Sequence, residues 1–457
     1  MRKNDSASKF LFVMIFAAIF LMSQAVLAVE IMPVKDIKPG MKGYGYTVYQ
    51  GVMPEKFKFE VLGVDYFYNT AVDSPVVLVK LTSGPKDFPP EKTGVVAGMS
   101  GSPMYINGKL VGALAYGFGK LPKDPIAGIQ PAENMLDPHN KTNKVGGANR
   151  NIPLVLSMPN DMVDLFTKVD RFKNDPYFKD NFVIKAAAHA RSTTEEADAD
   201  LKMQPGSSLN VYIAKGDITM SANGTVTMVE GDKIYAFGHP FFGFGEVEMP
   251  FHQAAVITTL SDYADSYKMA GGDVGTVAGT ITDDYYSAIN GTIGKTPRML
   301  ALGLRLEGPD GVRTVKVDVA KLPALTAKVV GAVAINSINR GYLEVACLPA
   351  NTAQEMTIKT KINFYESPPI TMTGSYGFKF HGTPYGEDLI GVTISDDLIW
   401  AITEYINEFG PIILEMERRG VLNKISGISI EVVFAKVPEK NPVSPNENVE
   451  IKEIALK

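Results

Sequence analysis

The pattern of apolar and polar positions predicts a chain built mainly of β-strands. Residues 56–64 alternate polar and apolar side chains, which is typical of a half-buried strand. Residues 43–48 interleave glycine with aromatic and β-branched residues, as strands with close backbone approaches do. Asn-Gly pairs at 107–108 and 223–224 each stand between apolar runs, a strong hairpin signal. We therefore expect antiparallel β-structure through the first two thirds of the chain.

The last third predicts a smaller β-rich module with one clear helix. Four stretches have strand character and suggest a sandwich-like unit: residues 312–319, 327–334, 342–348 and 356–365. A helix is expected near residues 395–409, where an apolar stripe recurs at helical spacing. Gly410 and Pro411 are expected to end it.

The N-terminal segment has the features of a secretory signal peptide. Arg2 and Lys3 precede an uncharged apolar run, and small residues lead up to Ala28. We expect cleavage after Ala28, no membrane span in the mature chain, and an exported protein of the bacterial periplasm or cell envelope. The predicted organisation is a signal peptide at 1–28, β-domains at 29–145 and 146–305, and the C-terminal module at 306–457.

Composition narrows the chemistry. The 457 residues carry a formal net charge of −5, which argues against a nucleic-acid-binding protein. One cysteine excludes a disulfide within the chain, and one cysteine with five histidines makes a zinc cluster unfavourable. No metal or organic cofactor is implied.

The strongest candidate for chemistry is the turn GMSGSP at residues 98–103, which feeds directly into the hairpin at 107–108. Flanking glycines can expose a serine hydroxyl and free backbone N–H groups for an oxyanion. The lipase elbow GxSxG is not matched, because Ser102 replaces its last glycine. The plain alternative is a Gly/Ser-rich turn without chemistry.

The turn and hairpin resemble the trypsin-like pattern GDSGGP, and GMSGSP followed by NGKLVGA resembles more specifically the SpoIVB-type serine peptidases. The resemblance covers residues 33–136 well and 205–295 less securely. It implies trypsin-like antiparallel β-barrel halves, with Ser100 as the nucleophile. It also implies an oxyanion hole from the N–H groups in the stretch Gly98 to Ser100, chiefly Gly98 and Met99.

His239 is the main candidate for the general base. It stands between Gly238 and Pro240 at a strand end, and histidine titrates near neutrality. SpoIVB-type peptidases carry a similar Gly-His. His252 is the runner-up. A plain alternative for His239 is a strand-end histidine bonded to backbone.

The order of the two segments differs from the family pattern. In the sporulation peptidase the histidine precedes the serine, whereas here Ser100 precedes His239. Either the two halves are permuted around one site, or the second half is not the catalytic partner. No orienting acid stands out among the aspartates at 87, 232, 273, 283 and 284.

Two functions remain open from the sequence. The first is an exported serine endopeptidase that cleaves protein or peptide substrates through an acyl-enzyme, with Ser100 as nucleophile and His239 as general base. The second is a non-catalytic envelope protein that binds peptides or partners on the same scaffold. The distance between Ser100 and His239 discriminates between them. The sequence does not define the oligomeric state.

Overall fold

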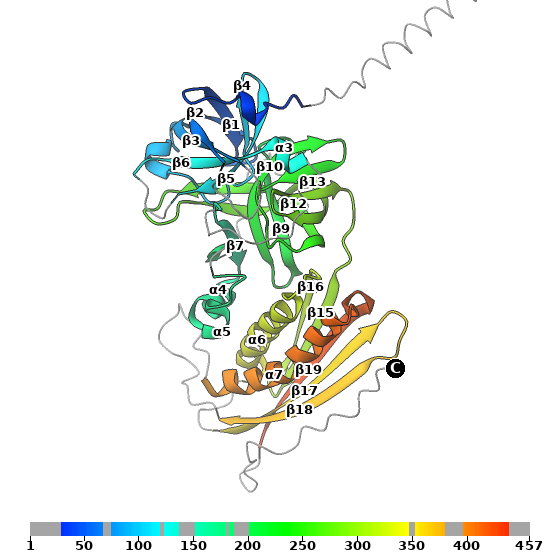
Figure 1. The fold of residues 1–457 in the computed structure, drawn as a ribbon. Helices are drawn as coiled ribbons and strands as arrows, with labels where there is room; N and C mark the ends of the chain where they lie inside the picture. The colour runs from blue at the N-terminus through cyan, green and yellow to red at the C-terminus, as the bar shows by residue number, and fades with distance from the viewer. Residues whose placement is uncertain are drawn as a thin grey trace, which may run out of the picture.

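The computed structural model describes residues 29–66, 75–118, 123–136, 151–179, 182–186, 201–346, 352–379 and 396–437. The proposed signal peptide at 1–28 lies outside these residues. The architecture is mainly β, as the sequence predicted, with few helices. Figure 1 shows an N-terminal barrel at one end, a second group of strands beside it, and a helix-covered module at the other end.

The N-terminal unit is a closed six-stranded antiparallel barrel in the order β1-β2-β3-β6-β5-β4. Its strands are β1 (Lys42–Thr47), β2 (Glu55–Asp65), β3 (Val76–Ser83), β4 (Pro103–Ile106), β5 (Lys109–Gly117) and β6 (Ile126–Pro131). The alternation in β2 buries Phe57, Phe59 and Val61 in the barrel core. The hairpin expected at Asn107–Gly108 is confirmed, since Ile106 pairs with Lys109 and both turn residues have positive φ.

The strands of the second unit belong to a 13-stranded sheet, which also includes the strands of the C-terminal module. Six of its strands pair in a ring, β9-β12-β13-β14-β11-β10 and back to β9. They are β9 (Ser208–Gly216), β10 (Met220–Glu230), β11 (Lys233–Ala236), β12 (Gly245–Leu260), β13 (Tyr267–Tyr285) and β14 (Ala288–Ile293). The strand β7 (Leu154–Met158) pairs with β10, and β8 (Phe182–Ala186) pairs with β7.

The hairpin expected at Asn223–Gly224 is wrong, because β10 runs straight through both residues. Asn223 is buried and donates to Asn210 and Ser208 of the neighbouring strand. The Phe237 ring lies against Gly224, where a Cβ would come within 2.3 Å of it. The chain instead turns at Gly231, where Glu230 pairs with Lys233. Side-chain packing on a buried strand has therefore overridden the local turn signal.

The C-terminal module packs two long helices on a five-stranded part of the same sheet (Figure 1). Its strands are β15 (Leu300–Gly308), β16 (Gly311–Val319), β17 (Ala353–Phe364), β18 (Ile370–Lys379) and β19 (Ile425–Lys436), and its helices are α6 (Thr326–Val345) and α7 (Asp396–Arg418). The strands expected at 327–334 and 342–348 are wrong, since α6 spans most of them. A short apolar run fits a buried helix as well as a buried strand, and α6 is buried on nearly every side.

The helix expected at 395–409 is present, and its apolar stripe is buried as predicted. It does not end at Gly410 and Pro411 but continues to Arg418. Proline removes one helical N–H donor. Beyond it, Ile413 and Met416 are buried in the core, and this packing favours continuation of the helix.

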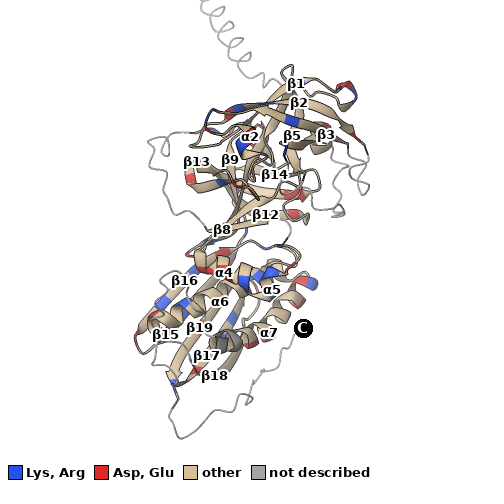
Figure 2. Cartoon of the chain, turned by 90° about the vertical axis from the view of Figure 1, so that its left-hand side faces the viewer, with Lys and Arg blue, Asp and Glu red and all other residues tan. Residues whose placement is uncertain are grey.

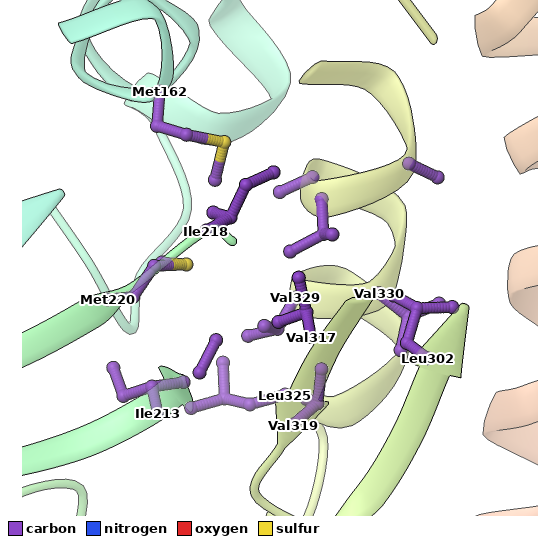
Figure 3. Close-up of a cluster of buried hydrophobic side chains, with 14 of the residues drawn as sticks. Met162, Ile213, Ile218, Met220, Leu302, Val317, Val319, Leu325, Val329 and Val330 are labelled. Atoms are coloured by element: carbon purple, nitrogen blue, oxygen red, sulfur yellow. The ribbon is translucent and has the colours of Figure 1, made fainter. Parts of the chain in front are cut away.

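One apolar core joins the second unit to the C-terminal module. Figure 3 shows side chains from both pointing toward one another. They come from the helix α4 (Asn160–Lys168) and from β9, β10, β15, β16 and α6, and include Met162, Ile213, Met220, Leu302, Val317 and Val329. Charged residues of both signs are interspersed over the described chain in Figure 2. No helix in the described part of the chain is long and apolar enough to cross a membrane.

Candidate active site

The serine turn, residues 98–102, links the short helix α2 (Pro90–Thr93) to β4 and docks on β5. The Met99 N–H donates to the Val96 carbonyl at 3.0 Å, and the Ser102 N–H donates to the Met99 carbonyl at 2.9 Å. The Gly101 N–H donates to the Leu114 carbonyl of β5 at 2.8 Å. These bonds fix the conformation of the turn. Ser100 within it is completely buried.

The second unit holds the same turn through its carbonyl groups. The Thr225 hydroxyl donates to the Gly98 carbonyl at 2.8 Å, and the Thr225 N–H donates to the Ser100 carbonyl at 2.8 Å. The Thr227 hydroxyl donates to the Gly101 carbonyl at 2.8 Å. Strand β10 therefore positions the serine turn, although it lies more than 100 residues away in the sequence.

The histidine turn follows β11 and bends sharply. Phe237 and Gly238 both have positive φ, at 69° and 71°. Positive φ is strained for phenylalanine, and such strain is often found at functional sites. A Cβ at Gly238 would lie 2.6 Å from the Ala113 Cβ of β5, so only glycine fits there. This bend brings the next residue, His239, against the N-terminal barrel.

Ser100 and His239 meet between the two units. The Ser100 Oγ lies 2.9 Å from the His239 Nε2, across 139 residues of sequence. The His239 Nδ1 lies 2.8 Å from the Pro240 carbonyl oxygen. A carbonyl only accepts, so Nδ1 carries the hydrogen, and the neutral ring presents its Nε2 lone pair to Ser100. Burial lowers the pKa of His239 to about 4, so the ring is neutral at pH 7.

Asp284 is the buried acid of the histidine side, but it binds backbone rather than the imidazole. Its carboxylate accepts N–H bonds from Phe241 at 2.7 Å, and from Phe242 and Gly243 at 2.8 Å each. A fourth, longer bond comes from Phe244. Burial raises the pKa of Asp284, while the four N–H bonds oppose that rise. Asp284 thus fixes residues 241–244, the segment directly after His239 and Pro240.

The other aspartates named from the sequence do not bind His239. Asp273 accepts bonds from Tyr212 and Lys215, and Asp283 accepts one from Thr282. Within the described ranges, no carboxylate is hydrogen-bonded to the His239 ring. The Pro240 carbonyl therefore stands where an orienting acid would be expected.

Lys268 is a buried group that sequence reasoning missed. Its Nζ donates to the Thr47 hydroxyl at 2.6 Å and to the Thr225 hydroxyl at 3.1 Å, beneath the serine turn. Burial lowers the pKa of Lys268 to about 7. Among the described residues, no carboxylate forms an ion pair with it. A lysine near the start of an alternating strand looks solvent-exposed in sequence, and no local signal marks it as buried.

His252, the runner-up base, lies on β12 with its Nδ1 3.0 Å from the Gln253 carbonyl oxygen, and no bond to Ser100 is found. A cavity of about 490 Å³ is lined by charged residues such as Glu248 and Arg298, and neither Ser100 nor His239 lines it. No group of three or more potential metal-ligating side chains occurs in the part of the chain that the structure describes.

A serine hydroxyl hydrogen-bonded to a neutral imidazole, between two units of antiparallel β-strands, is the arrangement of a serine peptidase. Residues 17–136 match the family model of the SpoIVB peptidase S55. The match supports a SpoIVB-type serine peptidase domain in this part of the chain. It includes Ser100 and ends before His239. Neither the curated proteins nor the solved structures gave a match.

Proposed function

We propose that this chain is a serine endopeptidase in which Ser100 is the nucleophile and His239 is the general base. The 2.9 Å contact between the Ser100 Oγ and the His239 Nε2 carries the proposal. It favours the view that the two halves are permuted around one site, because triads occur in several chain orders on different folds.

In the proposed reaction, the Ser100 hydroxyl gives its proton to the His239 Nε2 as its Oγ attacks a peptide carbonyl carbon. The imidazolium then protonates the leaving amine as the C–N bond breaks, which leaves an acyl-enzyme. Water, deprotonated by His239, hydrolyses the ester and restores both residues. The Pro240 carbonyl keeps the ring in the reactive tautomer throughout.

For the oxyanion hole we propose the N–H groups of Gly98 and Ser100. Neither has a hydrogen-bond partner within the described ranges, whereas the Met99 N–H is already bonded to the Val96 carbonyl. An oxyanion needs donors that are free to meet developing charge. Gly98 therefore keeps the role expected from the sequence, and Ser100 replaces Met99 as its partner.

The test is labelling of the purified mature chain with a fluorophosphonate probe. We expect Ser100→Ala to abolish labelling and His239→Ala to slow it by more than about a thousandfold, as losses of catalytic residues do. His252→Ala is the matched control and should label like the wild type. Equal labelling of wild type and His239→Ala would overturn the assignment of the base. A folded wild type that never labels, even with its site opened as described below, would favour a peptide-binding protein.

We also propose that the protein is exported to the periplasm or cell envelope. The charged start, the apolar run and the small residues before Val29 support this. N-terminal sequencing of the protein purified from its native cells should give Val29 as the first residue. Recovery of the full-length chain from the cytoplasm would contradict it.

A further inference from the structure

The edge of β5 carries three segments in succession. Strand β4 pairs with it as far as Ala113. The serine turn follows, with bonds between Leu114 and both Gly101 and Ser102. Residues 151–153 come next: the Ile152 N–H donates to the Ala115 carbonyl at 2.8 Å, and Asn151 forms an antiparallel bridge with Tyr116. We call residues 151–153 the strap.

The strap places a peptide carbonyl at the serine. The Ser100 Oγ donates to the Ile152 carbonyl oxygen at 3.1 Å. The same oxygen favours the protonated form of the His239 ring, because a carbonyl can accept a hydrogen bond only from a ring N–H. A hydroxyl has one hydrogen, so the Ile152 carbonyl competes with the His239 Nε2 for it. The strap therefore occupies the approach to Ser100 and withholds the proton that the base must accept.

The Ile152 side chain anchors the strap. It is 1% exposed and belongs to the apolar cluster of the N-terminal barrel, with Val96, Met99 and Leu114. It lies beside Gly117, where an added Cβ would be 3.8 Å from the Ile152 Cγ1. An extended main chain bonded to a strand edge, with one side chain in an apolar site, is how β-strand addition recognises peptides.

We propose that the strap is an internal pseudo-substrate, an inference that rests on the proposed function. It lies along the edge of β5 as an extended peptide substrate would, but the Ile152 carbonyl oxygen accepts from the Ser100 hydroxyl and not from the proposed oxyanion donors. The bond after Ile152 leads to Pro153, whose ring nitrogen has no hydrogen and whose ring restricts the preceding residue. The strap thus fills the site with a bond that is poorly suited to cleavage. The true substrate is an extended peptide with an apolar side chain in the place of Ile152.

Displacement of the strap should expose the serine. In Ile152→Ala the strap loses its apolar anchor, so we expect fluorophosphonate labelling of Ser100 to be at least about tenfold faster than in the wild type, as the open state gains population. Ile37→Ala is the matched control, because it removes the same atoms from the same barrel cluster at a residue that precedes β1. It should label at the wild-type rate, with circular dichroism showing that both variants are folded.

The outcomes separate the two proposals. If wild type and Ile152→Ala label at the same measurable rate, the strap is not inhibitory, but the peptidase assignment stands. If neither labels although both are folded, the peptidase assignment fails, and the pseudo-substrate fails with it.

Pro153→Ala tests the proposal independently, because this substitution leaves the Ile152 side chain in place. It converts the bond after Ile152 into an ordinary peptide bond held at the serine. Mass spectrometry should then detect scission between residues 152 and 153, and the double variant with Ser100→Ala should remain intact. An intact Pro153→Ala chain whose Ser100 still labels would overturn the pseudo-substrate geometry.

Discussion

The serine turn and the histidine turn are held by opposite kinds of hydrogen bond. The serine turn presents carbonyl groups to the second unit, which supplies donors from Thr225 and Thr227. The segment after His239 presents N–H groups, and the second unit supplies an acceptor, Asp284. Strands β10 and β13 of the second unit therefore position both the serine turn and the segment after His239. Only the histidine segment belongs to the same unit as these strands, because the serine turn is part of the N-terminal barrel.

The two buried ionisable groups, Lys268 and Asp284, differ in the same way as the two turns. Lys268 donates beneath the carbonyl-presenting turn, and Asp284 accepts beneath the N–H-presenting segment. Burial shifts the pKa of each toward its neutral form, downward for Lys268 and upward for Asp284. Asp284 has four N–H partners to offset its desolvation, whereas Lys268 has two hydroxyl groups. Asp284 is therefore the better compensated of the two, and the predictions below test this contrast.

The largest effect is expected where the two turns touch. Gly101 has φ of +93°, and a Cβ there would lie 1.9 Å from the Thr225 carbonyl oxygen and 2.5 Å from the Phe237 nitrogen. Gly101→Ala should therefore separate the serine turn from β10 and abolish labelling of Ser100. Gly108→Ala is the control, since Gly108 also has positive φ but no atom within 4 Å of its Cβ position. Equal labelling of both variants would mean that the turns do not depend on this close approach.

Removal of the carboxylate at Asp284 should have the next largest effect. Asparagine keeps the shape but replaces one acceptor oxygen with a donor that faces backbone N–H groups. We expect Asp284→Asn to lower the free energy of unfolding by about 3 kcal/mol, because hydrogen bonds to charged groups are worth roughly 1.5–3 kcal/mol each. Labelling should slow as His239 loses its support.

The neighbouring Asp283→Asn is the matched control for Asp284→Asn. Urea unfolding gives the stability of each variant, and the pH profile of labelling separates positioning from simple loss of folded protein. If Asp284→Asn is as stable as Asp283→Asn and labels as fast, the carboxylate does not position the histidine segment.

The pH at which the labelling rate falls in acid should report the protonation of His239 alone. With His239 as the proposed general base, labelling needs the neutral ring, and burial lowers the pKa of His239 to about 4. With the folded pKa below the ordinary value of 6.5, the ring remains neutral as pH falls until about pH 4. The labelling rate constant should therefore change little between pH 7 and pH 5 and halve near pH 4. Halving near pH 6.5 would show that the ring is solvated in the reactive state.

The two candidate residues that the structure brings together are those whose sequence signals are local. Ser100 was proposed from its glycine-flanked turn, and His239 from a constrained strand end. Asp284 was one of five aspartates without a distinguishing neighbour, because its partners are backbone N–H groups about 40 residues away. Lys268 and Ile152 gave no signal, since their roles depend on which strands the tertiary fold brings together.

The fold shows the same limit. Alternating polarity and the Asn107–Gly108 pair correctly predicted the mainly β class and the first hairpin. The same dipeptide at 223–224 failed, because Asn223 has buried polar partners on β9 and Gly224 receives the Phe237 ring. The apolar run in α6 failed because a fully buried helix has no polar face to set its period.

The smallest effect concerns the charge beneath the serine turn. Lys268 titrates near 10.5 when unfolded but at about 7 in the folded protein. Between these values the unfolded chain binds more protons than the folded chain, so the free energy of unfolding should rise with pH, by up to about 1.4 kcal/mol per pH unit. Lys268→Met keeps the aliphatic stem and removes the charge, so this rise should disappear. Urea unfolding at pH 7, 8 and 9 measures it, with the exposed Lys233→Met as control. A rise that persists in Lys268→Met would mean that another group causes it. Lys268 would then not be the poorly compensated buried cation that the comparison with Asp284 requires.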